Sequence, residues 1–594
     1  MTTSKILLEK NVPCTMRDGI VLYADIYRPD KEGTFPVLLS RLPYSKDKPL
    51  FSHRYLDTNR LVENGYVVII QDVRGRYQSE GEFQPFQSEA KDGYDTVEWA
   101  ASLPYSSGKV GMFGLSYYGF TQLLAATERP PHLAAMMPAM TLNDQRKGML
   151  FQQGAYGLGL LETWTLESML PDLIKRKYGD DKVAYAAAML QMGQNYNRLE
   201  ELYRYAPFCE WPPVKESGVA DFFFDYLRHD LAEEDFWEKS SITDKYEQIQ
   251  VPAYHVGGWY DCLLGSTIEN FTELREKAAG SEAQAQQKLI IGPWGHGDFS
   301  SVIGERSFGI HASGDWIDFR EDLTHLHLRW FDYWLKGVDT HVTKEPPVKI
   351  FVMGVNQWRN ENEWPLARTQ YVPYYFHSGG NAPTRYGDGS LSTEAPTDDE
   401  PTDQFVYNPG EPVPTQGGAT LYAGVNTMGP QDQRKVEERK DVLVYTSEPV
   451  TDPLEVTGPV TVYLWAATDA KDTDFTAKLV DVLPDGRAYN LTDGIIRARY
   501  RNGYRRSPDL QGEVVAYEID LWATSNVFLP GHRIRVEISS SNFPRFDANP
   551  NTGSTMKDSD QMKLARQTIY HTDQYPSHIL LPVIPAKGKE DLSR

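Results

Sequence analysis

The sequence has few cysteines for its length. Cys14, Cys209 and Cys262 are spread over 594 residues, and no two of them form a C-x-x-C pair. This scarcity is typical neither of a disulfide framework nor of a zinc site. We therefore expect no metal centre, and a reducing, cytoplasmic environment is the simplest interpretation.

Basic residues and long apolar runs are also scarce. The chain has 60 Lys and Arg against 82 Asp and Glu, a net charge of -22, which disfavours nucleic acid and anionic lipid because both bind through basic patches. The apolar runs VVII (67–70) and KLII (288–291) are far too short to cross a bilayer. Residues 1–19 lack the apolar segment of a secretion signal. We expect no nucleic-acid partner and no membrane partner.

The chain is too long for one core, and its sequence pattern changes three times. Short apolar strands alternate with helical segments up to residue 142 and again from 245, which predicts an α/β domain over 1–142 and 245–345. Apolar residues at helical spacing predict a helical cap over 143–244. Alternating strands, beginning with VKIFVMGV at 348, predict a β sandwich or jelly roll over 346–594.

The segment GLSYYG (114–119) lies between a buried strand and an apolar helix. A nucleophile elbow reads G-x-S-x-G, but here the second glycine is Gly119, one residue late. Ligands of α/β sheets bind beyond the carboxyl ends of the strands, where Ser116 would lie. Taken alone, the segment allows two interpretations, a nucleophile on a sharp turn or an ordinary serine in a glycine-rich loop.

Asp261 and His296 follow Ser116 in the chain order Ser, Asp, His that serine hydrolases of this architecture use. Each comes directly after a predicted strand, so both would reach the same edge of the sheet as Ser116. Asp261 is also a good cap for the following helix, and His296 is also placed to be a loop histidine held by Asp298. Their joint order and position favour a catalytic triad over these structural roles.

A tetrahedral intermediate also needs hydrogen-bond donors for its oxyanion. The backbone N–H of Tyr117 is one candidate, because it follows the nucleophile. No HGGG loop is present, but SRLPYSK (40–46) follows a strand in the corresponding place, so the Tyr44 hydroxyl is the second candidate. The alternative is that Tyr44 only packs beside Pro43.

Six segments together resemble a known family. They are RLPYSK, QDVRGRYQSEGEF, GKVGMFGLSYYG, GGWYD, IGPWGHGDF and SSNFPRFDANPNTG. They resemble the CocE/NonD, or cocaine-esterase-like, serine hydrolases, which are related to X-prolyl dipeptidyl-peptidases, glutaryl acylases and α-amino acid ester hydrolases. The serine motif of that family is G-x-S-Y-x-G, which accounts for the late glycine. The resemblance implies an α/β-hydrolase core, a helical cap and a C-terminal jelly roll.

The same resemblance implies a Ser116, Asp261, His296 triad with an oxyanion hole formed by Tyr44 and Tyr117. It also implies that the residue two places after the acid, Leu263, lines the acyl pocket. From the residues themselves, Trp164 and Phe222–Phe224 are candidates for the acyl wall, although aromatic residues at helical spacing more often belong to a core.

One difference from the related α-amino acid ester hydrolases bears on the expected substrate. Cys262, Leu263 and Leu264 stand where α-amino acid ester hydrolases have acidic residues, so an ammonium group would be desolvated without compensation. We expect a serine acyl hydrolase for small carboxylic esters with an aromatic or apolar acyl group. This chemistry needs no cofactor. An acylase or peptidase acting on amides and a binding protein with a dead site are the alternatives, and the sequence leaves open whether the protein is a homo-oligomer.

Overall fold

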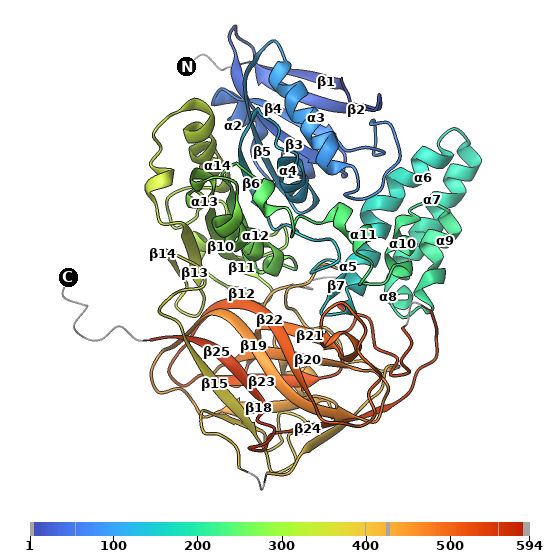
Figure 1. The fold of residues 1–594 in the computed structure, drawn as a ribbon, viewed down its shortest axis with the longest axis vertical. Coiled ribbons are helices and arrows are strands. Elements are labelled where there is room, and N and C mark those ends of the chain that lie inside the picture. The colour runs from blue at the N-terminus through green and yellow to red at the C-terminus, as the bar shows by residue number, and fades with distance from the viewer. Residues whose placement is uncertain (1–4, 54, 398–399, 423–427, 556–557, 586–594) are drawn as a thin grey trace, which may run out of the picture.

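The computed structural model of the protein describes residues 5–585 except 54, 398–399, 423–427 and 556–557. Figure 1 shows an α/β part at the N-terminal end, a group of helices beside it, and a large β-rich body below both. No helix of the described ranges is long and apolar enough to span a membrane.

The α/β part is built on a 10-stranded sheet. Its strands, in spatial order, are β1 (Ile6–Thr15), β2 (Val21–Pro29), β4 (Val67–Asp72), β3 (Phe35–Leu42), β5 (Ser106–Leu115), β6 (Leu133–Ala139), β9 (Tyr254–Tyr260), β10 (Lys288–Gly295), β13 (Val348–Val352) and β14 (Gln357–Glu361). The strands from β4 to β13 run parallel, whereas β1, β2 and β14 add antiparallel pairs at the two edges. The predicted parallel sheet is therefore mixed at its edges.

The parallel strands are covered by helices, which explains their nearly continuous apolar sequences. The helices of this part are α1 (Pro49–Ser52), α2 (Thr58–Glu63), α3 (Glu89–Ser102), α4 (Tyr117–Thr127), α12 (Leu264–Lys277), α13 (Ser281–Ala285) and α14 (Leu323–Phe331). Every residue of β4 and of α4 is buried. A helix that is apolar all round belongs inside a protein, so α4 holds the turn at its N-terminus in a rigid place.

The strand predicted to begin the β-rich domain lies elsewhere. VKIFVMGV contains β13, which pairs parallel with β10 through Leu289 and Val348, and so extends the first sheet. The prediction for this strand was wrong because alternation along a strand tells which side chains are buried, not which sheet the strand joins.

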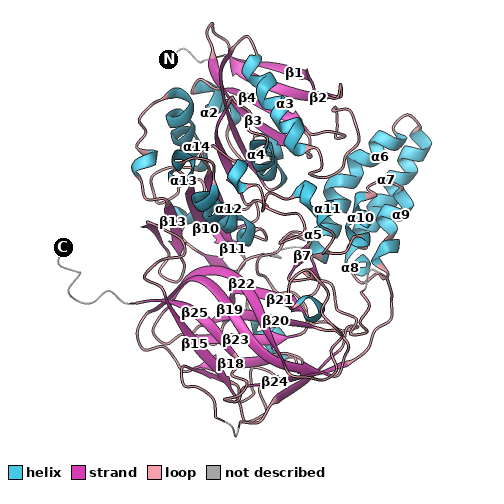
Figure 2. Cartoon of the chain, in the orientation of Figure 1, coloured by secondary structure: helices cyan, strands magenta, loops and turns pink. Residues whose placement is uncertain are grey.

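A helical segment is inserted between β6 and β9, which are nevertheless neighbours in the sheet. It contains the short strands β7 (Phe151–Gln152) and β8 (Ala155–Tyr156), the helices α5 (Leu158–Thr163), α6 (Leu170–Tyr178), α7 (Lys182–Asn197), α8 (Leu199–Leu202), α9 (Pro212–Ser217), α10 (Phe222–Arg228) and α11 (Glu234–Trp237), and a π-helical turn at Trp164–Met169. The two ends of the segment are tied together: the Ile242 N–H donates to the Asn143 carbonyl (2.8 Å) and the Gln145 N–H to the Ser240 carbonyl (3.1 Å). Figure 2 shows α6 to α10 as a separate helical group.

The β-rich body is an 11-stranded sheet, and its buried apolar residues form one cluster with residues of β9, β10, β13 and α12 of the α/β part. Its strands are β15 (Gln370–His377), β16 (Ser390–Ser392), β17 (Asp403–Tyr407), β18 (Leu443–Ser447), β19 (Leu454–Thr468), β20 (Asp474–Val482), β21 (Ala488–Arg497), β22 (Val515–Phe528), β23 (Arg533–Ser539), β24 (Ala565–Tyr570) and β25 (His578–Ile584). The strands fold over one another into a jelly-roll-like domain. β11 (Val302–Ile303) and β12 (Arg306–Ser307) form a separate small hairpin.

Candidate active site

Ser116 occupies a strained turn between β5 and α4. Its φ is 60° and its ψ is -123°, a conformation that non-glycine residues rarely adopt and that is found mostly at functional sites. The turn is held from both sides, because the Ser116 N–H donates to the Ala139 carbonyl (2.9 Å) and the Thr141 hydroxyl donates to the Ser116 carbonyl (2.7 Å). The surrounding structure therefore fixes the direction of the serine side chain.

The two glycines of GLSYYG are required by close packing around this turn. A Cβ on Gly114 would lie 2.4 Å from Tyr118, and one on Gly119 would lie 2.7 Å from the Cβ of Thr141. Thr141 is the residue that holds the Ser116 carbonyl, so the second glycine is needed at position 119. The shifted motif thus has a local steric cause.

Asp261 and His296 form a buried pair at the carboxyl ends of β9 and β10. The two side chains are 0% and 7% exposed, and His296 Nδ1 lies 2.6 Å from Asp261 Oδ1. An ionised carboxylate only accepts, so Nδ1–H is the donor, and in the neutral imidazole Nε2 keeps its lone pair. Burial opposes the charged form of the imidazole, but Cys262 and Asp261 beside it outweigh burial and raise the pKa of His296. Burial also raises the pKa of the Cys262 thiol. A neutral thiol carries no charge that could stabilise the imidazolium, so we attribute the raised pKa of His296 to the Asp261 carboxylate.

The Tyr44 hydroxyl lies beside Ser116. It accepts a hydrogen bond from the Trp164 Nε1–H (3.0 Å) and interacts with the Ser116 side chain. Burial raises the pKa of Tyr44 to about 12, so the phenol keeps its proton at neutral pH. The protonated hydroxyl can therefore act as a donor to an oxygen bound in front of Ser116.

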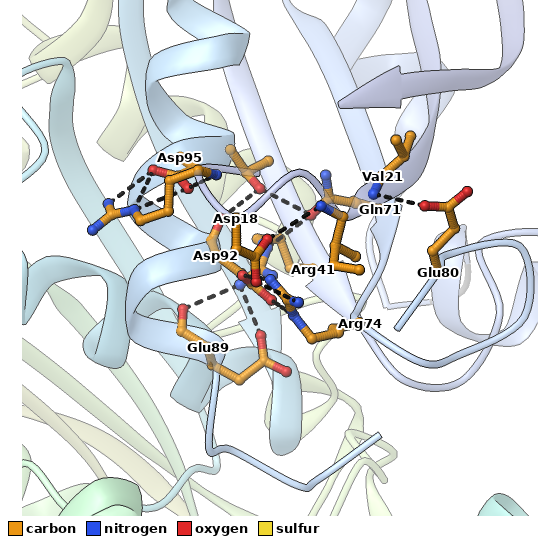
Figure 3. A network of polar contacts seen from close by, with 12 residues as sticks. Asp18, Val21, Arg41, Gln71, Arg74, Glu80, Glu89, Asp92 and Asp95 are labelled. Carbon is orange, nitrogen blue, oxygen red and sulfur yellow. Dashed lines mark hydrogen bonds and ion pairs between the residues drawn. The ribbon is translucent and has the colours of Figure 1, made fainter. Parts of the chain in front are cut away.

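Tyr117 begins α4, so its backbone N–H lies at the positive end of the helix dipole. Its side chain is anchored behind the turn: the hydroxyl donates to Glu89 Oε1 (2.8 Å) and accepts from the Phe86 N–H (3.1 Å). Arg41 pairs with Glu89 (2.8 Å) and also donates to Gln71 (2.8 Å), the arrangement at the centre of Figure 3. This buried network ties the start of α4 to the strands β3 and β4.

Ser116, His296 and Tyr44 face one cavity of about 940 Å³, within the usual range for small-molecule sites. Six of the predicted residues line it, namely Tyr44, Ser116, Tyr117, Trp164, Leu263 and His296. Apolar and aromatic residues such as Tyr55, Phe86, Tyr118, Leu142 and Phe299 line it too, and so do the charged residues Asp57, Arg60, Asp298, Asp315 and Asp322. Asp261 is behind His296. Phe222–Phe224 do not line the cavity, and Phe222 instead packs behind Trp164, with ring centroids 5.9 Å apart.

Three residues near the site were not predicted to act there. Arg41 and Glu89 had one usable signal, since a charged residue inside the buried strand FPVLLSRL needs a buried partner. Cys262 was considered only as part of an apolar wall. Within the described residues, Asp261, Cys262 and His296 form a cluster of groups able to hold a metal ion.

A serine on a strained strand-to-helix turn and a buried histidine–carboxylate pair at the same cavity define a serine hydrolase of the α/β-hydrolase type. Residues 18–298 match the family of X-Pro dipeptidyl-peptidases (S15 family), and residues 340–580 match the X-Pro dipeptidyl-peptidase C-terminal non-catalytic domain. The chain is 38% identical to the cocaine esterase of Rhodococcus sp. (strain MB1 Bresler) over 592 residues, 98% of this chain and 100% of that protein.

Solved structures agree in fold. An α-amino acid ester hydrolase is 25% identical with a TM-score of 0.80, covering 98% of this chain and 97% of its own. A CocE/NonD family hydrolase from Staphylococcus aureus is 20% identical with a TM-score of 0.70, covering 98% and 94%. The chain belongs to the CocE/NonD family of serine ester hydrolases. The predicted fold class, an α/β-hydrolase core with a C-terminal jelly-roll-like domain, is confirmed.

Proposed function

We propose that Ser116 is the nucleophile, His296 the general base and Asp261 the carboxylate that orients the imidazole. The observation that carries this assignment is the convergence of Ser116 and His296 on one cavity, with Asp261 2.6 Å behind the imidazole. His296 Nε2 takes the Ser116 proton as the oxygen attacks the ester carbonyl. The Tyr44 hydroxyl and the Tyr117 N–H stabilise the oxyanion. When the tetrahedral intermediate collapses, the alcohol leaves with a proton from His296 and the acyl group stays on Ser116. Water then attacks this acyl-enzyme in the same way and releases the acid.

The acyl group that we propose is aromatic or apolar. Apolar and aromatic side chains, among them Leu142, Trp164 and Leu263, line the cavity that holds Ser116, and charged side chains line it as well. No carboxylate stands at 262–264 to offset the desolvation of an ammonium group. A relative named cocaine esterase supports an ester of a small molecule as the substrate class. A cytoplasmic location and a homo-oligomeric state stay predictions.

Amide cleavage is the second candidate, favoured by the match to the X-Pro dipeptidyl-peptidase family. Esters and amides pass through the same tetrahedral intermediate, so the triad geometry serves both. Paired substrates with one acyl group and either an alkoxy or an amino leaving group separate the two. We expect the ester to have the higher kcat/KM, and a preference for the amide would reverse the assignment.

The nucleophile is tested by labelling with a fluorophosphonate probe, peptide mapping and an assay with a short-chain nitrophenyl ester. We expect the label on Ser116 and an equal loss of esterase activity. Ser116→Ala should abolish both, with a loss of kcat on the order of 10⁶-fold, as when the serine of another triad is removed. Ser168→Ala, at a second cavity serine, is the matched control and should keep label and activity. A label that persists in Ser116→Ala would contradict the assignment.

A further inference from the structure

Three metal-ligating side chains meet at the base of the candidate active site. One ligand atom each of Asp261, Cys262 and His296 lies within 4.8 Å of the other two. Zn²⁺ holds its ligand atoms at bonds of roughly 2.0–2.3 Å, which places them about 3–4 Å apart. Displacements of the three ligand atoms by about 1 Å would therefore bring them to bonding distance of one ion.

A second observation points to a ligand at this place. The Asp261 side chain is 0% exposed, and within the described part of the chain its Oδ2 has no hydrogen-bond partner. A buried carboxylate oxygen without a partner costs free energy and is a strong acceptor for a cation. The site is also reachable, because Cys262 and His296 both line the cavity that holds Ser116.

We propose that Asp261, Cys262 and His296 form an inhibitory site for a thiophilic divalent cation such as Zn²⁺ or Cd²⁺. A thiolate, an imidazole nitrogen and a carboxylate oxygen supply three ligands, and water completes a tetrahedral set. The Cys262 S–H bond breaks, its proton passes to solvent, and the electron pair left on sulfur forms the metal bond. Nothing is oxidised or reduced. Mg²⁺ and Ca²⁺ prefer oxygen ligands and should bind poorly.

Inhibition follows because the ion takes the groups on which proton transfer depends. An imidazole bound to a cation cannot accept the Ser116 proton, and a carboxylate bound to it no longer orients the ring. This consequence rests on the roles proposed above for His296 and Asp261, whereas binding of the ion does not.

Binding is measured first, without reference to activity, by titrating the protein with Co²⁺. A cobalt–thiolate bond gives a charge-transfer absorption in the near ultraviolet, which Zn²⁺ should abolish by displacement. We expect the band in the native protein and in Cys209→Ala, which removes a cysteine elsewhere in the chain. We expect no band in Cys262→Ala or Cys262→Ser. A band that survives in both Cys262 variants would overturn the site.

Inhibition is measured with the nitrophenyl ester, each variant normalised to its own metal-free rate. Mutating a residue that only hydrogen-bonds to a metal ligand lowers metal affinity by roughly 10–100-fold. Removing the proposed ligand Cys262 should therefore raise the half-inhibiting Zn²⁺ concentration by about tenfold or more. Mg²⁺ should leave the rate unchanged and a chelator should restore it after Zn²⁺. Equal inhibition of the native protein and Cys262→Ser would contradict the proposal. Fluorophosphonate labelling of Ser116 without metal tests the catalytic assignment separately.

Discussion

The two sides of Ser116 are built differently. On the oxyanion side, Tyr44 is held by Trp164, and the Tyr117 side chain is held by Glu89 and by the Phe86 N–H. On the base side, Asp261 holds His296 through one carboxylate oxygen, while its other oxygen has no hydrogen-bond partner among the residues that the structure describes. The side chains of Tyr44 and Tyr117 are thus held by residues of separate elements, whereas the direction of the imidazole depends mainly on Asp261. Substitutions on the two sides should therefore differ in their cost.

The largest loss of kcat in this comparison should come from breaking the contact between Asp261 and His296. Asp261→Asn keeps the shape of the residue but favours the wrong imidazole tautomer, and the same change in a well-studied triad lowers kcat about 10⁴-fold. Steady-state kinetics on an ester measures the effect. Asp298→Asn, at another cavity aspartate in the loop of His296, is the matched control and should lose little. If the control lost more activity than Asp261→Asn, the orienting carboxylate would have to be reassigned.

Tyr44→Phe should have an intermediate effect. Removing one oxyanion donor lowers kcat by roughly 10²–10³-fold, with KM nearly unchanged because the donor acts mainly in the transition state. Trp164→Phe removes only the donor that orients Tyr44, so its loss of kcat should be smaller. A loss of less than a few-fold in Tyr44→Phe would place the second oxyanion donor on another residue.

Tyr117→Phe should have the smallest effect on catalysis. The backbone N–H stays in place, so we expect kcat to fall by less than tenfold, while the lost bond to Glu89 costs about 1.5–3 kcal/mol in the free energy of unfolding. Tyr66→Phe is the control, since it removes a similar bond to Asp332 (2.7 Å) away from the site. It should lose comparable stability and no kcat. Equal kcat losses in both variants would mean that the network behind Tyr117 acts through general stability alone.

The candidate triad could be predicted from the sequence because each member directly follows a strand. Parallel strands bring their carboxyl ends to one edge, so the order of Ser116, Asp261 and His296 was enough to suggest that they meet. The partnership of Arg41 with Glu89 could not be predicted, since 48 residues separate them and helical periodicity does not tell which charge a buried strand faces. The placement of β13 failed for a similar reason, because sheet membership is decided by packing rather than by local pattern.

The inward face of the cap was only partly predictable. Trp164 lines the cavity, whereas Phe222–Phe224 are buried but are not among its lining residues. All are aromatic residues of helical segments, so their sequences do not distinguish the two fates. Trp164 begins the π-helical turn at Trp164–Met169, and the phenylalanines begin α10. Which face of each segment meets the cavity is decided by how the cap packs on the sheet.

The joined ends of the cap have a consequence for how such enzymes diversify. The chain leaves the sheet after β6 and returns to the neighbouring strand β9, and Asn143 and Ile242 are hydrogen-bonded at this junction. The cap is therefore an insertion at a single position of the sheet. A cap of different length or composition could be exchanged there without altering the spacing of the strands that carry Ser116 and Asp261. Natural variation and laboratory recombination can thus reshape the acyl wall without moving Ser116 and Asp261, but an exchanged cap must still supply a donor to Tyr44 in the place of Trp164.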